Sequence, residues 1–144
     1  MINTRKFTIF FILYCLLSLV IFLGVAFTGL AGLAYMFTII PFYLCCVLYC
    51  ANFTAKYQHQ VVIISHPSLY LVLTNQILML VTSPADCYGW HQGRNCHSFL
   101  QVHLENTLHQ SPTFWEAINR MFFVFLLLYI ILMMVYLKKI LQKR

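Results

Sequence analysis

Acidic side chains are nearly absent from this chain of 144 residues, which holds three aspartates and glutamates against nine lysines and arginines. Charged residues of both signs make up only 8% of the sequence, while hydrophobic residues make up 62%. A soluble domain carries about 25% charged residues, because polar side chains must cover its surface. The shortage of charge therefore argues against a soluble globular domain and predicts a surface that faces lipid.

The scarcity of acids also argues against several kinds of chemistry. Asp86, Glu105 and Glu116 all lie outside the long apolar runs or at their outer boundary, and ion pumps and secondary transporters normally need ionisable groups at mid-membrane. The sequence contains no H-E-x-x-H, no phosphate-binding glycine loop and no G-x-S-x-G. We therefore expect no catalytic residue and no cofactor.

Long apolar runs are what the chain has instead. No charged residue occurs between Phe7 and Asn52, a run about twice the roughly 20 residues that one spanning helix needs. The small-residue patch Thr28–Gly32 is the predicted turn between two helices, because glycine tolerates turn dihedrals. The predicted fold is one all-α membrane domain, residues 1–144. Its four predicted transmembrane helices cover about residues 6–27, 31–51, 60–82 and 114–137.

The basic residues indicate how these helices cross the membrane. Seven of the nine lie on one side only if segment 60–82 crosses, namely Arg5, Lys6, Lys56, Lys138, Lys139, Lys143 and Arg144. The positive-inside rule then places both termini and the 52–59 loop in the cytoplasm. We expect the cytoplasmic (inner) membrane of a bacterium, and a first helix that is retained rather than cleaved as a signal peptide.

Residues 83–113 form the one long polar segment, predicted to lie outside the cytoplasm. There Cys87 and Cys96 are separated by eight residues that include Gly89 and Gly93, so the chain can turn back on itself. Because thiols outside the cytoplasm tend to be oxidised, we predict a Cys87–Cys96 disulfide, which would restrict the unfolded chain by about 2 to 3 kcal/mol. Four side chains of this loop are candidates for contact with a partner: Tyr88, Trp90, His91 and Arg94.

A zinc site and a response to acid are two other interpretations of the outer segment. The five potential zinc ligands are Cys87, His91, Cys96, His97 and His103. Their spacing matches no familiar closed zinc site, and an oxidised pair cannot ligate, so we expect no metal. His97, His103 and His109 could instead make the loop respond to mild acid.

A short amphipathic surface helix is predicted after Cys96. Leu100, Leu104 and Leu108 recur every four residues, and Val102 lies beside them. The predicted helix lies on the membrane or packs over the bundle, with Ser111 and Pro112 ending it.

Segment 60–82 carries an unusual set of polar residues. His66, Tyr70 and Thr74 recur every four residues, with Asn75 and Gln76 beside the end of this stripe. Polar groups in hydrocarbon must face protein or water, so the stripe faces either its own bundle or the transmembrane helix of a partner. Pro67 in this segment and Pro41 in the second are predicted to kink their helices.

The four remaining cysteines, Cys15, Cys45, Cys46 and Cys50, fall within apolar segments. Of these, Cys45, Cys46 and Cys50 are predicted to be small buried hydrophobes. A membrane thiol-disulfide oxidoreductase is an alternative function, but the chain has no C-x-x-C. In addition, Cys50 is expected about 30 Å from Cys87, across the membrane.

The sequence thus offers contact surfaces and no evident chemistry, which favours a non-catalytic protein that binds another integral membrane protein or a membrane-active toxin. In layout it is similar to the small four-helix immunity proteins that protect cells against pore-forming bacteriocins, with both ends cytoplasmic and a basic C-terminal tail. That resemblance implies an immunity role and transfers no residue role. The predicted class of binding proteins also includes exclusion proteins and accessory subunits. The alternatives are the oxidoreductase that uses Cys87 and Cys96, and a small oligomeric channel or transporter. Membrane lipids are expected partners, and nucleic acid is not.

Overall fold

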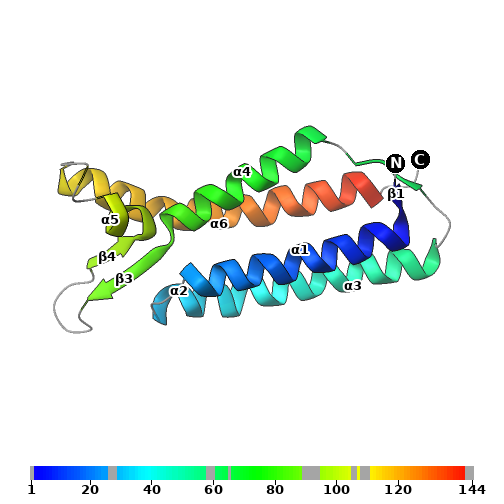
Figure 1. Cartoon of the computed structure of the whole chain (residues 1–144), viewed down its shortest axis with the longest axis horizontal. Coiled ribbons are helices and arrows are strands. Elements are labelled where there is room, and N and C mark those ends of the chain that lie inside the picture. The colour runs from blue at the N-terminus through cyan, green and yellow to red at the C-terminus, as the bar shows by residue number, and fades with distance from the viewer. Residues whose placement is uncertain are drawn as a thin grey trace.

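The computed structural model describes residues 2–25, 29–57, 61–64, 66–88, 95–104, 107 and 111–141. Four passes run along the long axis of the molecule (Figure 1). The first is α1 (Thr4–Val25), and the second is a continuous run of α2 (Gly29–Ala34), the π-helical turn η1 (Tyr35–Ile39) and α3 (Ile40–Lys56). The third and fourth passes are α4 (His66–Thr82) and α6 (Pro112–Leu141).

Three of these passes are long and apolar enough to cross a membrane, which indicates a multi-pass membrane protein built from α-helices. They are Thr4–Val25, Gly32–Lys56 and Pro112–Leu141, with 22, 25 and 30 residues. α4 has 17 residues, about 25 Å at 1.5 Å per residue, and so is shorter than the hydrocarbon core of about 30 Å. The fourth predicted span is therefore a shorter helix that begins six residues later than expected.

Both chain ends and the connection before α4 lie at the same end of the bundle (Figure 1). Here β1 (Ile2–Asn3) pairs antiparallel with β2 (Val61–Val62). α4 then runs back toward the opposite end and makes the fourth pass. We call the end with the chain termini the basic end, because it carries Arg5, Lys6, Lys56, Lys138 and Lys139.

The second pass differs from the prediction at both of its ends. Gly29–Ala34 is helical, so most of the patch predicted as a turn belongs to the second pass. That pass also continues to Lys56 rather than residue 51, because residues 52–56 contain neither proline nor glycine to end it.

The prolines act differently from each other. Pro67 occupies the first turn of α4, where its missing N–H is tolerated, so the predicted kink inside this helix is wrong. Pro41 is the second residue after η1, and the preceding Ile40 N–H donates to the Tyr35 carbonyl five residues back. Because proline has no N–H and its ring crowds the carbonyl four residues earlier, the helix is widened at the place where a kink was predicted.

A small cap covers the end opposite the basic end. It consists of the antiparallel strands β3 (Pro84–Tyr88) and β4 (Asn95–Ser98) and the short helix α5 (Phe99–Leu104). The described part of the predicted surface helix is thus six residues long, and its orientation differs from the prediction, since Gln101 is buried while Val102 is 45% exposed. The strand pair was not predicted. We call this end the cap end.

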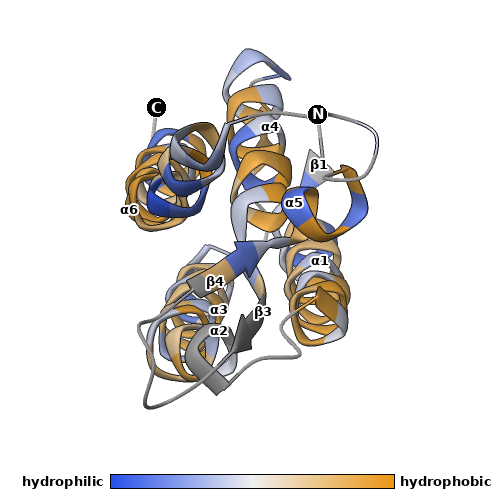
Figure 2. Ribbon diagram, turned by 90° about the vertical axis from the view of Figure 1, so that its left-hand side faces the viewer, coloured by the Kyte–Doolittle hydropathy of each residue, from blue (hydrophilic) through white to orange (hydrophobic). Residues whose placement is uncertain are grey.

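The outer surface of the passes is strongly apolar. Figure 2 views the molecule from the cap end and shows hydrophobic residues around most of each helix. Val20 and Phe37, for example, are 67% and 72% exposed. Helices that are hydrophobic all round indicate a bundle whose exterior is solvated by lipid.

Candidate functional site

The interior of the bundle contains a closed ring of side-chain hydrogen bonds. Five side chains form it, and they come from all four passes: Tyr14 and Ser18 of α1, Tyr43 of α3, Gln76 of α4 and Tyr129 of α6. All but Tyr14, which is partly buried, are buried in the apolar core. We call this set the ring.

The direction of each hydrogen bond follows from counting protons. Gln76 Nε2 donates to Ser18 Oγ at 2.6 Å, and Gln76 Oε1 accepts from the Tyr14 hydroxyl at 2.5 Å. A hydroxyl has one proton, so Tyr129 must donate to Tyr14 across their 2.8 Å contact. By the same count Tyr43 donates to Tyr129 at 2.6 Å, and Ser18 donates to Tyr43 at 2.7 Å. Every hydroxyl therefore donates once and accepts once.

This closure has an energetic reason and a functional consequence. An unpaired polar group costs several kcal/mol in hydrocarbon, since no water is available to it, and hydrogen bonds in a continuous chain polarise one another favourably. The ring can thus hold four passes in one relative arrangement. Because each ring hydroxyl has committed its only proton within the ring, the ring has no hydroxyl proton to offer a ligand.

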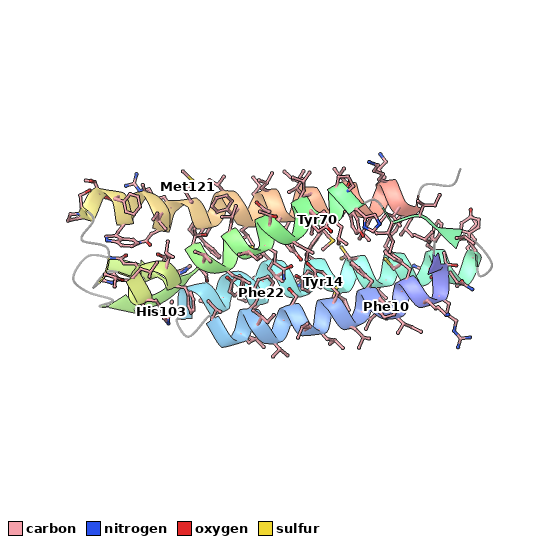
Figure 3. The ribbon with its side chains drawn as sticks, turned by 45° about the horizontal axis from the view of Figure 1, so that its top comes forward. Phe10, Tyr14, Phe22, Tyr70, His103 and Met121 are labelled. Atoms are coloured by element: carbon pink, nitrogen blue, oxygen red, sulfur yellow. The ribbon has the colours of Figure 1, made fainter. Side chains whose placement is uncertain are left out.

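The predicted polar set of α4 divides between the inside and the outside of the bundle. Asn75 and Gln76 are buried, and Asn75 Nδ2 donates to the Phe125 carbonyl of α6 at 2.8 Å. His66, Tyr70 and Thr74 instead face outward, and the Tyr70 side chain is 66% exposed. Figure 3 labels Tyr70 on α4. We call these three outward residues the outer polar face.

The outer polar face extends to the depth of the hydrocarbon. Gln76 meets α1 at Tyr14 and Ser18, near the middle of that helix. Thr74 lies two residues before Gln76, and Tyr70 lies six residues before it. These separations correspond to about 3 Å and 9 Å along a helix that rises 1.5 Å per residue. These two residues therefore lie well inside a core with a half-thickness of about 15 Å.

Backbone pairing brings the two loop cysteines opposite each other. Cys87 of β3 is the direct register partner of Cys96 of β4, and directly opposed residues of antiparallel strands have the Cα separation that a disulfide needs. Cys96 is disulfide-bonded. The side chain of Cys87 lies outside the described part of the chain, so the predicted Cys87–Cys96 pairing stays a prediction.

The partner-contact residues predicted for the loop lie beyond what the structure describes. Trp90, His91 and Arg94 are outside the described residues, and only the backbone of Tyr88 is described. Within the described ranges no group of three histidine, cysteine or acidic side chains could hold a metal ion.

The cysteines of the passes are free thiols. Cys15, Cys46 and Cys50 are buried in the apolar core, as predicted for Cys46 and Cys50. The same prediction is wrong for Cys45, which is exposed on the surface of α3.

Asn119 of α6 attaches the cap to the bundle, a role that sequence reasoning missed. Its Oδ1 accepts from the Ser98 N–H at 3.0 Å, and its Nδ2 donates to the Cys96 carbonyl at 2.5 Å. The same Nδ2 lies 3.3 Å from Gln101 Oε1. One side chain thus contacts both β4 and α5.

The ring was also missed, apart from Gln76. Tyr14 and Ser18 lie four residues apart and so share one face of a helix, which is the one signal of the ring in the sequence. Among the described residues, Asn75 and the members of the ring bond within the bundle, whereas His66, Tyr70 and Thr74 are exposed on its outer surface. The chain matches no protein-family model, no curated protein and no solved structure.

Proposed function

We propose that this chain is a non-catalytic membrane protein that acts by binding another membrane protein. The partner is either a complex of which this chain is an accessory subunit, or an invading toxin or phage component that it blocks as an immunity or exclusion protein. The setting we propose is the bacterial cytoplasmic membrane, with both termini and the basic end toward the cytoplasm.

The outer polar face of α4 is the observation that carries this proposal. Tyr70 and Thr74 are exposed on the bundle at a depth where lipid offers no hydrogen bond. Polar side chains at that depth associate transmembrane helices by bonding across the interface, each bond being worth about 0.6 to 2 kcal/mol. The short length of α4 adds to this, since a partner helix would cover a segment that spans the core incompletely.

Substitution of the outer polar face tests the proposal. A chain with His66→Leu, Tyr70→Phe and Thr74→Val keeps its shape and becomes more apolar, so it should still insert and fold. We expect at least a tenfold loss of the partner that co-purifies in mild detergent from the native membrane, measured by quantitative mass spectrometry.

Tyr49→Phe is the matched control. Tyr49 is 51% exposed on α3, so its substitution also removes a lipid-facing phenol, and it should leave co-purification unchanged. Recovery of the same stoichiometric partner with the triple variant would contradict the proposed interface. Purification of the native chain without any membrane partner would contradict the binding function itself.

The outer loop is the second part of the proposed surface. We infer a Cys87–Cys96 disulfide that holds Tyr88, Trp90, His91 and Arg94 in one small loop, supported by the strand register and by the bonded state of Cys96. Replacing both cysteines with serine should lower stability yet preserve partner binding at high expression. If function is instead lost completely while the fold survives, and the pair cycles between thiol and disulfide, the oxidoreductase alternative is favoured.

A further inference from the structure

A crevice of about 630 Å³ lies between α1 and α3 at the basic end. Asn3, Arg5 and Thr8 line it on one side, and Ala51, Thr54 and Ala55 line it on the other. Ala51 and Ala55 are one helical turn apart, and their small side chains leave space beside the helix. Its volume is in the range of small-molecule sites, about 300 to 1,000 Å³.

Two hydroxyls join the walls of this crevice. Thr8 Oγ1 and Thr54 Oγ1 are 2.7 Å apart and link α1 to α3. At the mouth, Asn3 Oδ1 accepts from the Arg5 N–H at 3.2 Å and lies 3.3 Å from the Thr4 hydroxyl. The polar atoms around the crevice are thereby fixed in place, and the crevice is part of the helix contact rather than a gap between loops.

The charge around the crevice is positive, and none of the described residues that line it is acidic. Arg5 and Lys6 occupy the first turn of α1, which contains no acidic residue, although the N-terminus of a helix already carries a partial positive charge. Lys56 in the last turn of α3 lies at the same end. Glu116 forms an ion pair with Arg120 near the start of α6. That pair lies at the cap end, far from the crevice.

The surroundings of the crevice are apolar on the membrane side. Ile9 lies beside it and is 51% exposed, and the next residue, Phe10, is 62% exposed. A molecule in the crevice would thus have an anion-attracting mouth at the membrane surface and a lipid-facing wall below it. A phospholipid has this division between a charged headgroup and apolar chains.

We propose that this crevice binds the phosphate-bearing headgroup of an anionic phospholipid. Arg5 contacts the phosphate, the space beside Ala51 and Ala55 takes the glycerol region, and the acyl chains continue along the exposed surface of α1. Basic clusters beside a membrane span attract anionic lipid in general. The proposal adds a defined site for one lipid molecule, formed by shape as well as by charge.

The test uses the purified full chain in neutral detergent, titrated with phosphatidylglycerol and observed by native mass spectrometry. We expect one tightly bound lipid per chain. Arg5→Gln should weaken this binding about tenfold, and Ala55→Leu, which fills the crevice without changing any charge, should weaken it by a similar factor. Lys139→Gln removes the same charge at the same end but outside the crevice, so it should change the affinity less than twofold.

Each other outcome contradicts the proposed site. Equal weakening by Arg5→Gln and Lys139→Gln would indicate general attraction to the basic end. If the Ala55→Leu and Ala51→Leu variants both bind phosphatidylglycerol as tightly as the native chain, the lipid binds elsewhere. If the native chain binds phosphatidylcholine equally tightly, the site does not select for the charge of the headgroup. Competition by inorganic phosphate at the same concentration as the lipid would identify a site for a free anion. Circular dichroism and gel filtration verify that each variant folds.

Discussion

The Tyr43 hydroxyl holds two members of the ring at once. It receives a proton from Ser18 at 2.7 Å and donates one to Tyr129 at 2.6 Å. Removing this single oxygen leaves the Ser18 proton without its acceptor and the Tyr129 oxygen without its donor. Loss of this one atom would therefore leave two buried side chains, Ser18 and Tyr129, each with an unsatisfied hydrogen-bonding group.

We expect Tyr43→Phe to lower the free energy of unfolding by about 1 to 3 kcal/mol, because it leaves buried partners unsatisfied. The measurement is the midpoint and slope of unfolding in a denaturing detergent. Tyr49→Phe removes a phenol from the exposed side of the same helix and should change stability by less than about 0.5 kcal/mol. Equal effects of the two substitutions would show that the ring contributes nothing to stability.

At the scale of single residues, the sequence predicts little of the hydrogen-bonded ring. Gln76 is recognisable as a polar residue that must find a partner in hydrocarbon. Tyr14, Tyr43 and Tyr129 are not, because a tyrosine in an apolar run is equally compatible with a core or a membrane interface. The ring depends on distances between four separate helices, and periodicity along one helix contains no information about them.

Among the elements, the cap is hydrogen-bonded to α6 by the side chain of Asn119. Asn119 contacts β4 at the Ser98 N–H and the Cys96 carbonyl, and it reaches α5 at Gln101. Ser98 also receives the Gln101 N–H at 3.2 Å, so it caps α5 in the manner of an S-x-x-Q sequence. These contacts position a small hairpin and a two-turn helix that have few buried apolar residues of their own.

We expect Asn119→Leu to loosen the cap without unfolding the bundle. Hydrogen–deuterium exchange of a peptide covering residues 95–104 should be about tenfold faster in the variant, since the Ser98 N–H loses its acceptor. Exchange in α1 and α3 should not change. Asn52→Leu, on the exposed surface of α3, is the control, and equal protection of the cap in both variants would contradict the role of Asn119.

The long helices are the elements that the sequence predicts well, because an apolar run of sufficient length has no other stable form in a bilayer. The strand pair of the cap was missed because its strands have five and four residues, too few for a clear alternation. α4 was placed correctly at its C-terminal end, Thr82, whereas Pro67 fixes its start rather than bending its middle.

At the scale of the whole molecule, the membrane topology depends on whether α4 crosses the bilayer. Three helices meet the length for a span, yet α4 still returns the chain from the basic end to the cap end (Figure 1). A segment that starts with the paired strand β2 and continues as a 17-residue helix thus carries the chain along the bundle, and we expect it to complete a fourth crossing.

Labelling with a membrane-impermeant maleimide tests this topology. In a chain whose Cys87 and Cys96 are serine, Lys56→Cys should be labelled only in inside-out vesicles and Ser111→Cys only in right-side-out ones. The physical reason is that the two positions lie at opposite ends of a bundle that crosses the core. Labelling of both positions from one side would mean that α4 does not carry the chain across.

The ring also bears on electrical insulation. A row of hydroxyls with two open ends that reach water could relay protons from one side of a membrane to the other. Here the last acceptor, Gln76, is also the first donor, so the path returns to its own start. A membrane can therefore hold these five polar side chains at its centre without gaining, through them, a leak that would dissipate its voltage.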